Sequence, residues 1–82
     1  MDKKKYTKKD YIPDQNTCSE IENLNSQKED LSNFNLKEAQ LEKIYLVNAK
    51  MRGCDLSKAN LKSSSMFEAD LSNSNLFKAN LE

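Results

Sequence analysis

The stretch that decides the fold reads Ala59-Asn60-Leu61-Lys62-Ser63, and it returns as Ala69-Asp70-Leu71-Ser72-Asn73 and again as Ala79-Asn80-Leu81-Glu82. Its spacing extends over the later part of the chain, where every fifth residue is Leu or Met, eleven times in succession. Two residues before each of these stands a residue that is mostly small or apolar, and the column between is mainly Asp and Asn. The Leu/Met column is the predicted structural core: Leu31, Leu36, Leu41, Leu46, Met51, Leu56, Leu61, Met66, Leu71, Leu76 and Leu81.

A period of five residues fits neither regular element, because a helix keeps one face at a spacing near 3.6 and a strand at 2. In an extended chain the small residue and the Leu two positions later point to one side. The next small residue follows after three positions, so the chain must turn once in every unit to keep both inside. Asp and Asn suit such corners, since their side chains bond to the nearby backbone. The pattern therefore predicts an all-β solenoid of short extended segments joined by corners.

A second period of twenty residues indicates that four units close one coil. It aligns Ala39, Ala59 and Ala79 inside. Outside, it forms two columns of alternating charge, Asp30 with Lys50 and Asp70, and Glu42 with Lys62 and Glu82. Eleven units then make about two and three-quarter coils. Exposed opposite charges on neighbouring rungs attract weakly, so they favour this register without proving it.

With these units in view, the chain closely resembles the pentapeptide repeat family, whose unit is A(D/N)LXX. The resemblance covers residues 29–82, and it implies a right-handed quadrilateral β-helix with the Leu/Met and small residues inside. Four residues of the first coil depart from the pattern, namely Tyr45 and Lys50 at the Asp/Asn position and Phe34 and Ile44 at the small position. An irregular core, or a contact with the N-terminal segment, is expected there.

The chain before the repeat is expected to contribute little beyond a cap. Residues 1–13 are polar and lysine-rich, which indicates a flexible, solvated arm; a basic patch for nucleic acid or an acidic partner is the weaker alternative. Residues 14–28 are predicted to form an N-terminal cap, as a short helix or an irregular segment. Ser19 and Glu22 fit a capping box, and Cys18, Ile21 and Leu24 form an apolar stripe. The competing interpretation makes residues 19–28 an extra repeat.

The C-terminal end of the repeat is predicted to be uncapped, because the sequence stops within a unit at Leu81-Glu82. Either such ends stack between molecules, giving end-to-end self-association, or the chain is a fragment of a longer repeat protein, which we favour. A cloning scar at Leu81-Glu82 would leave the same open end.

Composition excludes most catalytic chemistry. The 82 residues carry 13 Lys+Arg, 13 Asp+Glu, no His and one Gly. Without His there is no Ser/His or Cys/His pair and no His-ligated metal, and one glycine cannot form a phosphate loop. We therefore expect no catalytic, cofactor-binding or metal-binding residues, no cofactor and no enzymatic activity. No apolar run is long enough for a signal peptide or membrane span, and two cysteines without a predicted disulfide favour the cytoplasm.

Outward apolar residues supply the one candidate interaction patch. Twenty-residue stacking puts Val47 beside Phe67, with Tyr45 next to Val47, while Phe77 falls on another face. Such a cluster on a polar surface can bind a partner, although packing under the N-terminal arm or a missing continuation is the favoured explanation. Cys54 takes a small inward position and is expected to be an inert, packed thiol.

The predicted function is a non-catalytic scaffold or protein–protein interaction module with an unidentified protein partner, and without nucleic acid or membrane binding. The alternative comes from the resemblance: some pentapeptide repeat proteins mimic DNA and bind type II topoisomerases such as gyrase. That mimicry needs a strongly negative rod, whereas residues 31–82 carry seven Lys/Arg against six Asp/Glu. The near-neutral repeat surface disfavours it.

Overall fold

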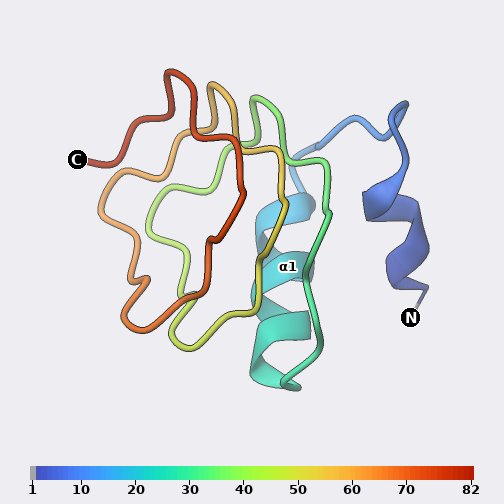
Figure 1. Cartoon of the computed structure of the whole chain (residues 1–82), viewed down its shortest axis with the longest axis horizontal. Coiled ribbons are helices and arrows are strands. Elements are labelled where there is room, and N and C mark those ends of the chain that lie inside the picture. Colours follow the sequence, from blue (N-terminus) through green and yellow to red (C-terminus); the bar gives the residue numbers. More distant parts are fainter. Residues whose placement is uncertain (1) are drawn as a thin grey trace.

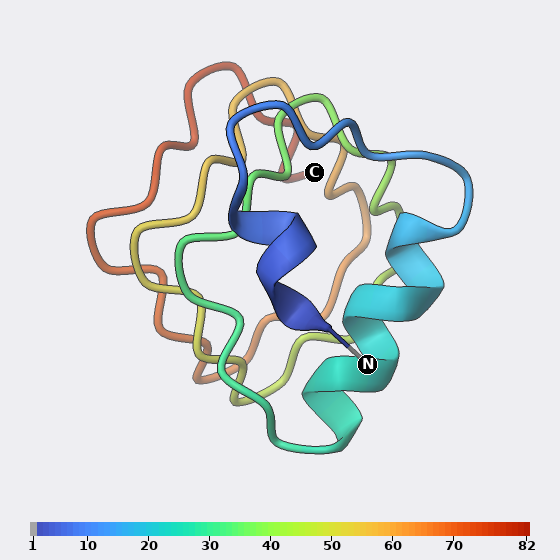
Figure 2. The same cartoon turned by 90° about the vertical axis from the view of Figure 1, so that its right-hand side faces the viewer.

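From Asp30 onward the chain winds in successive loops that lie beside one another (Figures 1 and 2). The computed structural model describes residues 2–82 and measures 30 × 25 × 25 Å along its principal axes. Each loop returns after twenty residues, as the predicted register requires. The parallel bridges join Asp30 to Lys50, Asn35 to Asp55, Gln40 to Asn60, Tyr45 to Ser65, Lys50 to Asp70, Asp55 to Asn75 and Asn60 to Asn80.

The regular elements are a 3-10 helix, η1 (Lys3–Thr7), and an α-helix, α1 (Thr17–Ser26). Within residues 2–82 the coil contains isolated bridges and no strand or sheet. The predicted all-β class is therefore not confirmed in this form. The physical reason is that each five-residue unit pairs one residue with its neighbour before the chain turns, which is too short a run to count as a strand.

The turns do not lie at the Asp/Asn positions, where the sequence pattern predicted them, but between each Leu or Met and the next small residue. In most units the N–H of the small residue donates to the C=O of the preceding Leu or Met, as between Ala39 N and Leu36 O at 3.0 Å. The residue before it has a positive φ, 60° at Glu38, as a type II turn requires. The Asp/Asn residue instead forms the bridge, and its side chain accepts from the N–H two positions on, as Asn60 Oδ1 does from Lys62 at 3.1 Å. Asp and Asn thus support the corner without occupying it.

The core is completely closed at the N-terminal end of the coil and open at the other. Every inward Leu or Met from Leu31 to Leu61 is buried, together with the small-column residues between them. Met66, Leu71 and Leu76 are only partly buried, and Leu81 is 55% exposed. The third coil therefore presents one unpacked face.

The N-terminal segment differs from the expected solvated arm. Tyr6, which lies within η1, has 0% of its surface exposed. Its ring centroid lies 5.0 Å from that of Phe34 and 5.0 Å from that of Tyr11, and its C=O accepts the Asn35 N–H at 2.6 Å. Figure 2 shows η1 lying across the opening of the first coil. The large Phe34 at a small-residue position creates the apolar surface that holds Tyr6, so this segment is part of the core.

The predicted helix after residue 14 is present, which rules out an extra repeat at residues 19–28. The capping box is wrong, because α1 begins at Thr17 and Ser19 lies within it. Thr17 instead fixes the start of the helix. Its hydroxyl accepts from the Asp14 N–H at 2.8 Å, and its own N–H donates to the Asp14 C=O at 3.1 Å. Ile21 and Leu24 are buried as expected, and Cys18 is partly buried.

Candidate functional site

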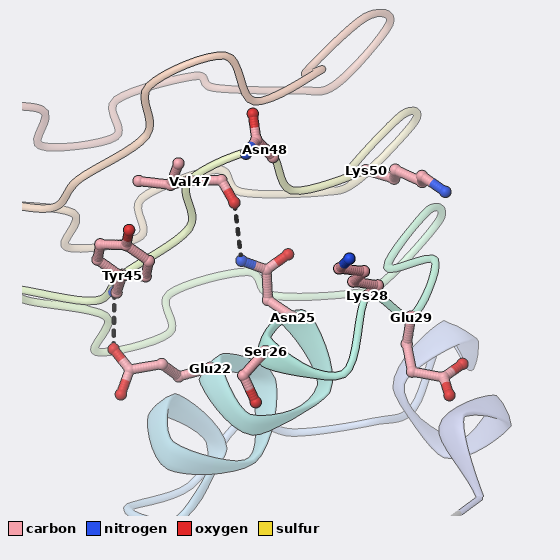
Figure 3. Close-up of a pocket in the computed structure, with 9 residues that line it drawn as sticks. All are labelled: Glu22, Asn25, Ser26, Lys28, Glu29, Tyr45, Val47, Asn48 and Lys50. Atoms are coloured by element: carbon pink, nitrogen blue, oxygen red, sulfur yellow. Dashed lines mark hydrogen bonds between the residues drawn. The ribbon is translucent and has the colours of Figure 1, made fainter.

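Side chains of α1 complete the hydrogen bonding of the first coil. Glu22 Oε2 accepts the Tyr45 N–H at 2.7 Å, and Asn25 Nδ2 donates to the Val47 C=O at 3.2 Å (Figure 3). One coil later the equivalent N–H, on Ser65, donates to the backbone C=O of Ile44 at 2.9 Å. The two side chains therefore take the place of a preceding rung, and α1 closes one side of the coil's N-terminal end.

A groove of about 600 Å³ runs between the second half of α1 and the segment that follows Tyr45. Tyr45 stands at one end of it, and Lys28 and Lys50 stand at the other (Figure 3). A volume of this size lies within the usual range for binding sites. The groove is lined by Glu22, Asn25, Ser26, Lys28, Glu29, Tyr45, Val47, Asn48 and Lys50.

The charges of the groove are close to balance. Glu29 is held by the Lys3 ammonium at 3.1 Å, and Glu22 is occupied by the Tyr45 N–H. Within the described residues Lys28 and Lys50 form no ion pair, although Lys50 lies between Asp30 and Asp70 in the neighbouring rungs. The groove thus carries no strong field of either sign, and its distinguishing feature is the exposed aromatic side chain.

The structure brings the predicted patch residues to one side of the molecule. Tyr45 is 57% exposed and Phe67 is 71% exposed, while Val47 is partly buried between α1 and the next coil. The Asn48 N–H donates to the Phe67 C=O at 2.9 Å, which fixes Phe67 one rung from Val47. Tyr45, Val47 and Phe67 form a single apolar face, which we call the aromatic face.

Sequence reasoning missed the contribution of α1 to this site. Glu22 and Asn25 are three residues apart, so they lie on the same side of a helix. That spacing was the available signal, together with the replacement of the usual Asp or Asn by Tyr45. The sequence alone did not place the helix against this rung.

Both cysteines are free thiols whose burial disfavours the reactive thiolate. Cys54 is buried, its thiol donates to the Leu31 C=O at 3.1 Å, and burial raises the pKa of the thiol to about 11. Burial also raises the pKa of Cys18. A search of residues 2–82 found no group of three His, Cys, Asp or Glu side chains that could hold a metal ion. In the same part of the chain, no helix has the length and apolar character to cross a membrane.

A comparison with protein-family models finds pentapeptide repeats, in eight copies, over residues 30–62 and 44–82. Together these matches cover the whole coil and well over half of the chain. A comparison with curated proteins found no match.

Proposed function

Because the chain belongs to the pentapeptide repeat family, we propose that it is a non-catalytic scaffold or protein–protein interaction module, built on a short right-handed quadrilateral β-helix. The bridges between residues twenty apart and the turn after every Leu support this architecture. The interior of the first two coils is filled by Leu, Met, Ala and Cys side chains together with Phe34 and Ile44. A filled coil leaves only its outer faces for binding, which favours recognition of a protein over turnover of a small molecule.

The observation that carries this proposal is the aromatic face. Tyr45 and Phe67 are both more than half exposed, on neighbouring rungs of a chain whose other outward positions are largely polar. Exposed aromatic residues of this kind supply much of the binding energy of protein interfaces. The groove beside α1 adds amide and hydroxyl groups that can fix the orientation of a partner, among them Asn25, Ser26 and Asn48.

A photo-crosslinking amino acid at position 67 tests this proposal in cells that express the protein. The same amino acid at position 12 is the matched control, because Ile12 is 80% exposed and lies outside the groove. A protein captured at position 67 alone is then purified, and its affinity is measured for the wild type, Phe67→Ser and Ile12→Ser. We expect Phe67→Ser to weaken binding at least about fivefold and Ile12→Ser to leave it unchanged. Equal affinity of all three proteins would exclude the aromatic face.

The open end of the third coil supports a second partner, another copy of this chain. Among the described residues, the N–H groups of Met66, Leu71 and Leu76 have no hydrogen-bond acceptor, and the side chains next to them are only partly buried. Unpaired edges of this kind associate readily. The first coil is covered by η1 and α1, so we propose that two copies meet through their third coils.

Sedimentation velocity over a wide concentration range tests this association. We expect the apparent mass of the wild type to rise with concentration, and the Leu81→Lys variant to remain monomeric, because Leu81 is exposed at that end. A wild-type protein that is monomeric at every concentration contradicts the association, but it does not contradict partner binding at the aromatic face.

A further inference from the structure

The outward charges of the coil stand in columns, and one column differs from the rest. Two columns alternate in sign, one through Asp30, Lys50 and Asp70 and the other through Glu42, Lys62 and Glu82. The column that begins at Glu38 instead places Lys58 and Lys78 on adjacent rungs. The Glu38 N–H donates to Ser57 O at 2.9 Å and the Lys58 N–H donates to Phe77 O at 2.8 Å, which fixes this order. Like charges on facing rungs destabilise a fold.

Neither lysine forms an ion pair within the described residues, although Glu38 lies one rung from Lys58. Among residues 2–82, the ion pairs join Lys3 to Glu29, Lys5 to Glu20 and Arg52 to Asp70, so Lys58 and Lys78 form none. The carboxylate of Asp55, three residues before Lys58, accepts the Ser57 N–H at 3.0 Å and the Ser57 hydroxyl at 2.6 Å. It is therefore engaged by Ser57. The Lys58 and Lys78 ammonium groups are therefore available to a partner.

Further basic and apolar groups lie along the same edge. Phe77 is 62% exposed, and the Lys78 ammonium lies 5.3 Å from its ring centroid. Lys37 occupies the corresponding corner of the first coil, and it shares a shallow hollow of about 300 Å³ with Lys9 of the N-terminal segment. Both of these lysines are exposed, and neither takes part in an ion pair within the described chain. We call this surface the lysine edge, made of Lys9, Lys37, Lys58, Phe77 and Lys78.

We propose that the lysine edge docks an acidic segment of a partner protein. Carboxylates of the segment pair with the Lys58 and Lys78 ammonium groups, and an apolar side chain of the segment packs on Phe77. The rungs are about 4.8 Å apart, so the two flexible lysine side chains can reach carboxylates on alternate residues of an extended peptide, which share one face. This surface lies on a different corner from the aromatic face, and it does not depend on that face.

Charge favours an acidic protein segment over a nucleic acid. Nucleic acids bind through many evenly spaced phosphates, and proteins that hold them present several cations with few anions between. Here the Glu38 and Asp55 carboxylates lie among the lysines, and the chain as a whole has zero net charge. An acidic peptide can place its few carboxylates beside the ammonium groups and leave the other positions apolar, which suits Phe77.

Fluorescence anisotropy at low salt tests the proposal with a labelled, end-blocked peptide of about eight residues, in which two Glu residues and one Leu occupy alternate positions and therefore share one face of the extended peptide. We expect saturable binding to the wild type and about tenfold weaker binding to Lys58→Gln/Lys78→Gln. The matched control is Lys43→Gln/Lys62→Gln, which removes two exposed lysines from the corner that also carries Glu42 and Glu82. Its affinity should stay at the wild-type value. Phe77→Ser should weaken binding of the peptide as well.

Stability separates a binding role from a structural one. Because Lys58 and Lys78 repel each other, Lys58→Gln/Lys78→Gln should unfold at the same urea concentration as the wild type or a higher one. The proposal is overturned if no saturable binding occurs or if both double variants lose affinity equally. Equal binding of a peptide with Gln in place of Glu would also overturn it. Tighter binding of an oligothymidylate of equal length would assign the edge to nucleic acid instead.

Discussion

Replacement of Tyr6 by alanine tests whether the N-terminal segment belongs to the folded core. The Tyr6 ring is fully buried against Phe34 and Tyr11, and the Tyr6 hydroxyl donates to Glu20 Oε1 at 2.6 Å. Loss of a buried aromatic ring costs about 3–5 kcal/mol, because contacts disappear and a cavity remains. A chain of 82 residues has a total stability of about 4–12 kcal/mol. Tyr6→Ala should therefore remove a large part of the free energy of unfolding.

The measurement is urea unfolding followed by circular dichroism, with a thermal melt as a second readout. A loss of 3 kcal/mol corresponds to a fall in Tm of at least about 12 °C for a domain of this size. Tyr6→Phe keeps the ring and loses the hydrogen bond to Glu20, so it should cost only about 1–3 kcal/mol. The control is Ile12→Ala, because Ile12 is exposed in the same segment and its replacement should change stability by less than about 0.5 kcal/mol.

A solvated arm would give the opposite result. If residues before α1 were detached from the coil, Tyr6→Ala and Ile12→Ala would both unfold within about 0.5 kcal/mol of the wild type. That outcome would refute the packing of Tyr6 on Phe34. It would also leave the Asn35 N–H without its acceptor, the Tyr6 C=O.

Three further experiments address the pH dependence and the uneven core. Hydrogen bonds from the serine two residues on lower the pKa of Asp30 and of Asp70. The two carboxylates therefore contribute stability above about pH 4, and this contribution is lost as the pH falls through the lowered pKa values. Asp30→Asn/Asp70→Asn should flatten the acid arm of a stability–pH profile. Burial, followed by Glu20, raises the pKa of Tyr6, so stability should fall above about pH 10 in the wild type and less steeply in Tyr6→Phe. Leu46→Ala should cost about 2–5 kcal/mol in urea unfolding and Leu76→Ala clearly less, because only the first side chain is fully enclosed; equal losses would contradict the open third coil.

The five-residue column identified the inward positions, and the twenty-residue period identified the neighbours of each rung. Both follow from spacing alone, because the side chains at those positions face the interior in every unit. The position of the corner did not follow, since Asp70 bonds to the backbone two residues on and supports a turn that it does not occupy. Propensity indicates that a residue favours turns, but it does not identify which bond of the turn the residue makes.

The N-terminal contacts were beyond sequence reasoning for another reason. Tyr6 and Phe34 are 28 positions apart, and no repeat or period relates them. Their packing depends on the shape left by a large residue at a small position, which the sequence marked only as a departure. The aromatic face could be predicted because Val47 and Phe67 share the register, whereas the groove required the placement of α1 against Tyr45.

In this molecule the inward positions recur every five residues, whereas the outward neighbours of a residue lie twenty positions away. Deleting one five-residue unit keeps the inward residues of every remaining unit facing the interior, but it turns everything downstream by one corner. Loss of residues 51–55, for example, would bring Phe67 beside Glu42 instead of Val47. A lineage can therefore recombine whole binding surfaces by gaining or losing units, with no substitution at all, while Leu or Met and mostly small residues still face the interior.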